Sequence, residues 1–315
     1  MQVSVSFKTA EPAWWSDGRM SKPDIDAAAQ FLAASARVLD RRRFERLFGA
    51  GTAAAVRDAV AAYRNADGGF GHGLEPDLRD PASQASAIEI ALSTLDECDA
   101  WDDGLAAGAC DWLQANAPAQ GGSAFVLPTA TRWPHAPWWV PEPGGPPSLI
   151  QTGQVAGTLH ARGVTHPWLE RATGLMWSRI EAAGPLGPYD ALGVTRFLDH
   201  VPDRQRARQV LERIAPLLAA VVTLDPDAPG EIHSPLDFAP VPDSMARSLF
   251  SEQVISAHLD HLAAGQRDDG GWTFNWPAWS PAAELDWRGF ITVGALATLR
   301  ANGRLPAQTW PGLQP

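Results

Sequence analysis

The polar residues best suited to chemistry lie in one short acidic segment, which reads GLEPDLRD over 73–80. Glu75 and Asp77 are two positions apart, and the proline between them restricts the backbone, so their carboxyl groups are held in a fixed relation. At a partly apolar site, desolvation and the neighbouring charge would raise the pKa of one of them, which suits a general acid or an acid–base pair. The alternative is that Glu75 and Asp77 cap the following helix or pair with Arg79. His72 is close enough in the sequence to share the site.

Further carboxylates follow later turns of the chain in comparable places. They are Asp190, Asp237, Asp243, Glu284 and Asp286. Asp286 joins Glu75 and Asp77 as a third candidate catalytic acid. If these side chains converge on one rim, they can hold a divalent cation such as Mg²⁺, stabilise a carbocation or grip a polyhydroxyl ligand. Otherwise each carboxylate caps the helix that follows it. Mg²⁺ is therefore the cofactor that the sequence permits without requiring it, and we single out no residue as a metal ligand.

Tryptophan is the second chemically distinctive residue type, with 14 in 315 residues. Two loop segments are rich in it, RWPHAPWWVPEP over 132–143 and WTFNWPAWSP over 272–281. Aromatic faces stabilise cations and also stack on sugar rings, while packing within the loops is the competing explanation. The aromatic candidates for a substrate-binding wall are Trp138, Trp139, Trp276, Trp279 and Trp287. The polar candidates for substrate binding are His72, Asp190 and Asp237.

Composition limits the partners that this chain can take. The formal net charge is −11, and the one basic cluster, over 41–46, is expected to solvate a helix face, so the charge argues against a nucleic-acid partner. No window of about 18 apolar residues occurs, so no transmembrane segment is expected. Cys98 and Cys110 lack metal-ligand spacing and are expected to be free thiols in a reducing compartment. Since no signal peptide is evident either, we expect a cytoplasmic protein. The sequence predicts no particular oligomeric state.

Helical periodicity dominates the elements that must position these residues. Between Ser83 and Leu95, apolar residues recur at the spacing of one buried helix face. The segment from Asp24 to Leu39 is predicted as one Ala-rich helix with an acidic first turn. Further helices are predicted at roughly 52–64, 101–116, 148–162, 166–182, 190–200, 203–222, 247–265 and 288–302. No alternating β-branched run indicates a strand, so the predicted class is all-α.

The predicted helices come in a recurring format. Residues 61–70 read AAYRNADGGF and residues 263–272 read AAGQRDDGGW, so in both an apolar helix ends in Asp-Gly-Gly-aromatic. Weaker copies of this turn lie at 120–125, 184–189 and 230–238. Glycine ends a helix because it accepts the left-handed backbone, and the long loops after these turns should share one face. Helical hairpins of this kind can close into a ring, so we predict an α/α-toroid of roughly 10–12 helices. The predicted organisation is an N-terminal extension at 1–23, a single toroid domain at 24–303 and a C-terminal tail at 304–315.

The two clear turns resemble those of a known superfamily. DGGF at 67–70 and QRDDGGW at 266–272 are similar to the Gln-Trp repeats (QW motif) of squalene-hopene cyclases and the Gly-Gly-Phe repeats of protein prenyltransferase β subunits. The chain thus looks like a divergent member of the terpenoid cyclase and protein prenyltransferase superfamily. This resemblance implies inner helices around an aromatic-lined cavity that accepts an isoprenoid chain. It also implies that Phe70 and Trp272 are structural.

The motifs that carry chemistry in that superfamily are missing from this sequence. No Asp-x-Asp-Asp acid motif occurs, and the nearest string, over 99–103, is expected to begin a helix with an N-cap. No cysteine follows Cys110, so the prenyltransferase zinc set of an Asp, a Cys and a His lacks its thiolate. The Gly-Cys-Gly-Glu-Gln thioester of the complement toroids is also missing.

The acidic loop, the aromatic residues and the resemblance together favour one function, with two alternatives. The favoured one is an enzyme resembling class II terpene cyclases, which binds an isoprenoid or similar apolar small molecule and cyclises or rearranges it after protonation by Glu75 or Asp77. A carbohydrate-active hydrolase or lyase would instead use two carboxyl groups roughly 5–10 Å apart across the mouth. A non-catalytic binding protein would keep the ring and its ligand without turnover.

Overall fold

Helices make up the architecture of this protein. The computed structural model describes residues 23–182, 184–305, 310 and 312, and in these ranges the predicted all-helical class is confirmed, with isolated bridges and no strand. The α-helices are α1 (Ile25–Ser35), α2 (Val38–Phe48), α3 (Ala53–Ala61), α4 (Ala85–Glu97), α5 (Asp103–Ala115), α6 (Leu149–Ala161), α7 (Pro167–Glu181), α8 (Pro188–His200), α9 (Arg204–Ala219), α10 (Pro235–Phe238), α11 (Glu252–Ala264) and α12 (Pro281–Ala301). Short 3-10 helices follow at η1 (Pro128–Arg132) and η2 (Met245–Leu249).

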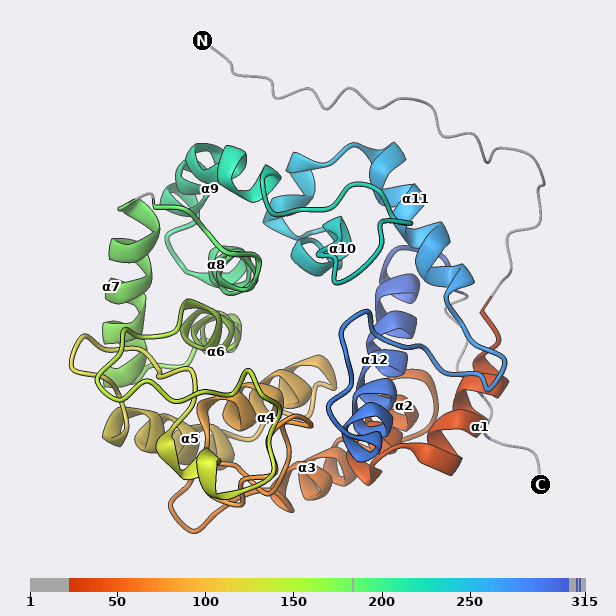
Figure 1. Ribbon diagram of the computed structural model, residues 1–315, viewed down its shortest axis with the longest axis horizontal. Helices are drawn as coiled ribbons and strands as arrows, with labels where there is room; N and C mark the ends of the chain where they lie inside the picture. The colour runs from red at the N-terminus through yellow and green to blue at the C-terminus, as the bar shows by residue number, and fades with distance from the viewer. Residues whose placement is uncertain (1–22, 183, 306–309, 311, 313–315) are drawn as a thin grey trace.

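The helices are arranged around a ring in two layers (Figure 1). Helices α4, α6, α8, α10 and α12 lie towards the centre, and α3, α5, α7, α9 and α11 lie outside them. The ring is closed at α12, which contacts both α1 and α2. This arrangement is what an α/α-toroid would require, while kinship with the toroid superfamily stays a prediction.

The long connections of the chain run from an outer helix to the next inner helix. They lie on the face that Figure 1 turns towards the viewer, which we call the mouth face. The connections are 62–84, 116–148, 220–234 and 265–280. Connections in the other direction, such as 98–102 and 201–203, are short. The predicted placement of the acidic and Trp-rich loops on one face follows from this alternation.

The prediction of a single helix over 24–39 is wrong. Asp24 caps α1 as expected, its side chain accepting from the Ala27 amide, but α1 ends at Ser35. Ala36 and Arg37 are extended, with ψ of 159° and 155°, and α2 begins at Val38. Both segments have helical periodicity, and the break coincides with the tertiary contact of the Arg37 side chain with the Leu74 oxygen.

Two other element predictions are corrected at the mouth face. Helix α12 begins at Pro281, capped by Ser280, seven residues before the predicted start at 288. Asp286 and Trp287 therefore lie on a helix and not on a loop. The short helix α10 was not predicted, since its four residues are fewer than periodicity can reveal. Asp102 caps α5 by accepting from the Leu105 amide, so the N-cap interpretation of 99–103 is confirmed.

The Asp-Gly-Gly turns join neighbouring hairpins. Gly68 and Gly270 have φ of +89° and +90°, and an added Cβ would lie 2.7 Å from the Gly108 oxygen and 2.1 Å from the Ala27 oxygen respectively. These positions need glycine both for the left-handed backbone and for the close approach of the next element. The aromatic residues that follow, Phe70 and Trp272, are 0% and 2% exposed in the core. Their burial agrees with the structural role that the repeats imply.

The closest helix crossing in the ring is that of α6 and α8. An added Cβ on Gly153 would lie 2.2 Å from the Gly193 oxygen, and one on Gly193 would lie 2.3 Å from the Leu149 oxygen. On Gly157 it would lie 2.6 Å from the Arg196 oxygen. Glycine at these positions lets the two backbones touch.

The last described residues return to the beginning of the ring. Trp310 packs edge-on against Phe44 with ring centroids 5.1 Å apart, and its Nε1 donates to Asp26 Oδ1 at 2.6 Å. Part of the predicted tail at 304–315 is thus attached to α1 and α2, while the predicted extension at 1–23 lies outside the described residues except for Pro23. Cys98 and Cys110 are buried free thiols, as predicted. None of the described helices combines the length and apolar character needed to cross a bilayer.

Candidate active site

The acidic segment at 73–80 is fixed to a second loop of the mouth face. The Arg79 amide donates to the Pro134 oxygen at 3.0 Å, and the Ala136 amide donates to the Asp77 oxygen at 2.8 Å. Leu78 packs in a small apolar cluster whose other members are Val126, Ala130, Ala136 and Trp139. These contacts join the connections 62–84 and 116–148, so the backbone that carries the acids is rigidly held.

Glu75 is the most perturbed carboxyl group of this segment. Its side chain is 6% exposed, and Oε1 accepts from the Asp77 amide at 3.1 Å. Burial, and after it the charges of Asp77 and Glu89, raise the pKa of Glu75 to about 8, against the opposing effect of Arg37. Glu75 is therefore mostly protonated at neutral pH and can donate a proton.

Asp77 shares the site but has a different environment. It is 4% exposed, and burial raises its pKa above the usual value, although the indole N–H groups of Trp287 and Trp279 and the charge of Arg79 act in the opposite direction. The Nε1 atoms of both indoles are buried. Within the described chain, neither has an acceptor that satisfies the distance and angle of a hydrogen bond. Nearby N–H donors thus favour the ionised form of Asp77 more than they favour that of Glu75.

Asp286 lies beside this pair but is bound to Arg79. Arg79 Nη1 and Asp286 Oδ2 are 2.8 Å apart, which joins the acidic segment to α12. This contact shows that the expected pairing of Arg79 with Glu75 or Asp77 is instead made with Asp286. The ion pair makes Asp286 a support for the acidic segment, and its catalytic role stays a prediction. Arg79 Nη2 is buried and has no hydrogen-bond partner in the described chain.

The predicted aromatic wall is assembled from the last loop and α12. Trp276 stacks on Phe274 with centroids 4.5 Å apart and meets Trp287 edge-on at 5.5 Å, and Trp287 meets Phe290 edge-on at 5.8 Å. Trp279 packs against the small apolar cluster under the loop over 126–139. Trp276, Trp279 and Trp287 therefore lie together, and Asp77 is within reach of two of them.

The other two tryptophan candidates have separate environments. Trp139 is 5% exposed and stacks on Phe125 with centroids 4.6 Å apart, so it packs within its own loop. Trp138 is 40% exposed and is available to a ligand at the rim. The loop-packing explanation thus applies to Trp139, and the ligand-binding one is retained for Trp138.

Of the three polar candidates for substrate binding, two are engaged in local contacts. His72 is exposed, has φ of +56° and bonds through Nε2 with the Asn65 side chain at 2.9 Å, as part of the turn. Asp237 caps α10 by accepting from the Ser234 amide at 2.6 Å, so the capping alternative holds for it. Asp190 lies in the first turn of α8, where burial raises its pKa. The described residues contain no group of three or more His, Cys, Asp or Glu placed to hold a metal ion. Binding of Mg²⁺ stays a prediction.

Several residues near the acids were not singled out from the sequence. Glu89 on α4 has its pKa raised to about 7, chiefly by burial, and its charge acts on Glu75. A glutamate between Ile88 and Ile90 on a helix with a buried face was the available signal. Tyr189 donates to Glu231, and the charge of Asp77 helps to raise its pKa, so this pair is also near the acids. The partners of Tyr189 come from loops that are distant in the sequence, so no local pattern indicates them.

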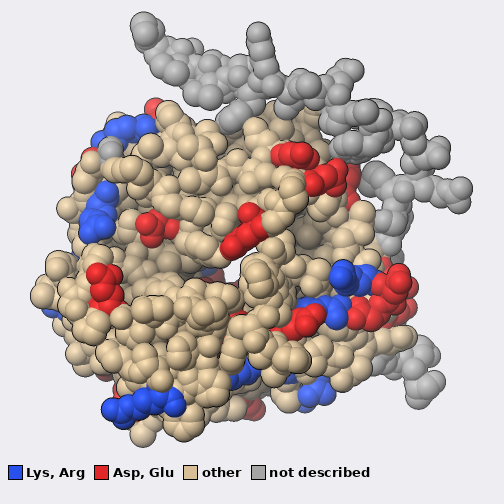
Figure 2. All heavy atoms as spheres, viewed as in Figure 1, with Lys and Arg blue, Asp and Glu red and all other residues tan. Residues whose placement is uncertain are grey.

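The centre of the mouth face is hollowed, as Figure 2 shows, and acidic side chains are visible around the hollow. Comparisons with known proteins bear on the fold alone. No family model matches the chain, and no curated protein matches it. A crystal structure of a protein from Actinoplanes is similar over 89% of both chains, with a TM-score of 0.53 and 17% sequence identity. This likeness indicates a shared helical fold and carries no information about activity.

Proposed function

We propose that this protein is an enzyme in which Glu75 acts as general acid and Asp77 is the second carboxyl group of the site, acting on a hydroxylated, carbohydrate-like substrate bound at the mouth face. The observation that carries the proposal is the pair itself. Both side chains are buried, the Glu75 carboxyl group accepts a hydrogen bond from the Asp77 backbone amide at 3.1 Å, and burial raises the pKa of Glu75 to about 8. Neighbouring acids whose environments differ in this way are the usual arrangement of a proton donor beside a base or nucleophile.

Acid strength favours a glycosidic oxygen over an alkene carbon as the proton acceptor. A carboxyl group with a pKa near the working pH protonates a leaving oxygen as the bond breaks. Protonation of an alkene produces a carbocation and needs a much stronger acid than one with its pKa raised to about 8. The polar surroundings of Glu75, which include Glu89 and Arg37, also suit hydroxyl groups better than a hydrocarbon chain.

The aromatic residues fit the same substrate. Trp276 and Trp287 form an edge-on pair next to Asp77, and Trp138 is exposed at the rim. Aromatic faces bind the apolar faces of sugar rings, while Nη2 of Arg79, which is buried and has no hydrogen-bond partner in the described chain, offers N–H donors to hydroxyl oxygens. A ligand rich in acceptor oxygens would satisfy these donors.

Acid-initiated cyclisation of an isoprenoid is the second candidate. It is favoured by the cluster of Phe274, Trp276, Trp287 and Phe290, since aromatic faces stabilise a cation by about 1–2 kcal/mol each when dry. A purely ligand-binding protein is the outcome if neither substrate class is turned over.

The deciding experiment compares both substrate classes on one preparation. Purified protein is incubated with α- and β-linked oligosaccharides and aryl glycosides, and with linear isoprenoid alcohols, epoxides and diphosphates, each with and without Mg²⁺. We expect sugar products, and we expect Glu75→Gln to lower kcat by about 100-fold or more. Glu284→Gln is the matched control, because Glu284 is exposed in the first turn of α12 and should leave kcat unchanged.

The outcomes separate the candidates. A cyclised isoprenoid that disappears in Glu75→Gln would replace the carbohydrate proposal by the second candidate. Binding of sugars or isoprenoids without any product would leave a binding protein. Turnover that Glu75→Gln does not reduce would overturn the assignment of the acid.

A further inference from the structure

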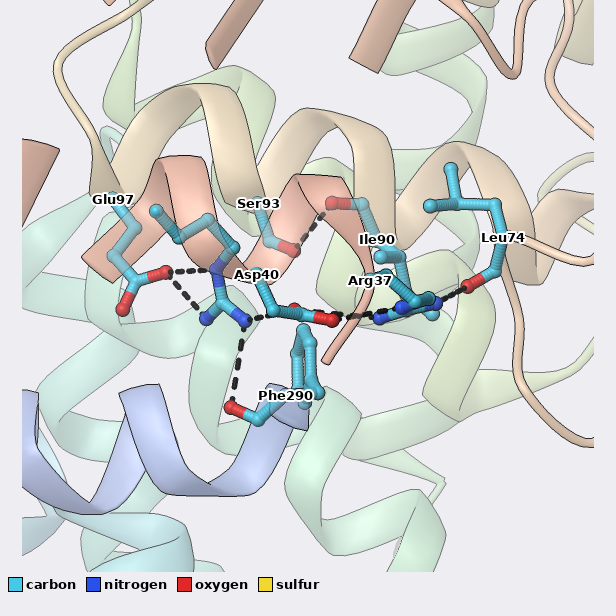
Figure 3. Close-up of polar contacts among 8 residues, drawn as sticks. Arg37, Asp40, Leu74, Ile90, Ser93, Glu97 and Phe290 are labelled. Atoms are coloured by element: carbon cyan, nitrogen blue, oxygen red, sulfur yellow. Dashed lines mark hydrogen bonds and ion pairs between the residues drawn. The ribbon is translucent and has the colours of Figure 1, made fainter. Parts of the chain in front are cut away.

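A buried ion network on α2 lies next to the acidic segment (Figure 3). Asp40 is 0% exposed and lies between two arginines. Arg37 Nε is 2.8 Å from Asp40 Oδ2, and Arg43 Nη1 is 3.1 Å from Asp40 Oδ1. Arg43 Nη2 continues to Glu97 Oε2 at 2.7 Å. The expectation that the basic cluster over 41–46 solvates a helix face is therefore wrong for Arg43, which is 3% exposed.

One end of this network reaches the mouth face. Arg37 Nη1 donates to the Leu74 oxygen at 2.8 Å, and Leu74 directly precedes Glu75. The Arg37 side chain is 8% exposed, so the contact is shielded from water. Arg37 is also the residue at which α1 and α2 separate, and the extended backbone there turns its side chain towards the segment.

Few charged groups act on Glu75 and Arg37. Glu75 is affected by Asp77 on its own loop, by Glu89 on α4 and by Arg37. Arg37 is in turn affected by Asp40, by Tyr63 and by Asp286 on α12. Among the charges acting on Glu75, that of Arg37 is the positive one, and it opposes the effects of burial and of the two acids.

We propose that Arg37 is a positioning residue for the Glu75 acid: it fixes the backbone at Leu74, and its positive charge acts on the Glu75 carboxyl group. This inference rests on the proposed function for its catalytic consequence, but the contact and the charge effect hold for the protein without substrate. A cation close to a general acid makes proton release easier than burial alone would allow, and it does so without touching the substrate.

The direct test is the titration of Glu75 in the free protein. Carbon-13 NMR of protein labelled at the glutamate carboxyl carbon follows each signal against pH, with Glu75→Gln and Glu89→Gln used to assign the two. We expect Arg37→Met to move the Glu75 midpoint upward by roughly 0.5–1 unit, because the stabilising cation is lost. Arg37→Lys keeps the charge and should move it less.

Arg43→Met is the matched control. Arg43 is a buried arginine on α2, bonded to the same Asp40 as Arg37, but it makes no hydrogen bond to Leu74. Its loss should destabilise the protein without moving the Glu75 midpoint upward, because Arg43 acts on Glu75 only through Glu89, whose pKa it lowers. An unchanged midpoint in Arg37→Met, or an equal shift in Arg43→Met, would overturn the proposal. If Arg37→Met does not fold, the comparison of Arg37→Lys with Arg43→Lys takes its place, with a shift expected in the first alone.

Activity gives an independent measurement once a substrate is known. Because Glu75 must be protonated, the rate falls above its pKa, and this alkaline limb should move to higher pH in Arg37→Met. The maximal rate should fall at the same time through loss of the Leu74 contact, and Arg37→Lys should partly restore it. A titration shift without any turnover in the native protein would support Arg37 and reject the proposed function, so the two failures are distinguishable.

Discussion

A single side chain, Glu75, shows how a reactive group reduces the stability of the fold that holds it. The carboxyl group has its pKa raised to about 8 in the folded protein, from 4.5 in an exposed state, and burial is the main cause. The folded state therefore binds the proton more tightly than the unfolded state. As the pH rises from the unfolded-state pKa of 4.5 to the folded-state pKa of about 8, the stability contributed by the protonated group is lost.

We expect Glu75→Gln to relieve this loss. Glutamine stays neutral at every pH, so the variant should gain stability relative to the native protein as the pH rises from about 5 to about 8, by on the order of a few kcal/mol. Urea unfolding at several pH values measures the difference. Glu284→Gln, at an exposed position, should show no such trend. A difference between Glu75→Gln and native protein that stays constant with pH would mean that Glu75 is not protonated in the fold.

At the scale of elements, the crossing of α6 and α8 depends on the absence of side chains. Gly193→Ala would place a Cβ 2.3 Å from the Leu149 oxygen, so the helices must move apart. We expect a loss of about 2–4 kcal/mol in the free energy of unfolding. Gly174→Ala on α7 is the control, since nothing lies within 4 Å of its Cβ, and it should be neutral or stabilising by up to about 1 kcal/mol. Urea unfolding of both variants is the measurement, and equal effects would contradict the close crossing.

The elements also show what the sequence can and cannot reveal. Most helices and the Asp-Gly-Gly turns follow from periodicity and glycine, which are local signals. Glu75 and Asp77 were found because they are neighbours in the sequence. The break at Arg37 was missed because both sides of it have helical periodicity, and the Leu74 oxygen that Arg37 contacts is 37 residues away. The early start of α12 was missed because the Trp-rich stretch before it has the composition of a loop.

The ion pair of Arg79 with Asp286 was not predicted for the same reason. The two residues lie far apart in the chain, and only the folded ring joins them at 2.8 Å. Likewise, Trp138 and Trp139 are adjacent in the sequence, and nothing local indicates that Trp139 packs in the interior while Trp138 is exposed. Local chemistry thus predicts which residues are candidates, and the tertiary contacts decide which of them meet.

At the scale of the whole molecule, the ring closes where α12 meets α1 and α2. Trp310 supports this closure through Phe44 and Asp26. We expect Trp310→Ala to cost about 1–2 kcal/mol and to lower Tm, because a half-buried aromatic contact and a hydrogen bond are lost together. Trp133→Ala, which removes an indole that is 47% exposed, should change Tm little. Equal Tm values for Trp310→Ala and the native protein would show that the closure does not depend on Trp310.

The closure between α12 and the first helices differs from every other junction around the ring in its connectivity. Successive elements elsewhere are tied by the peptide chain as well as by packing, whereas this junction consists of non-covalent contacts alone. A force applied to the two ends of the chain would therefore act on this junction first, before any hairpin is strained. The strength of the contacts of α12 with α1 and α2 therefore sets the resistance of the whole ring to mechanical opening.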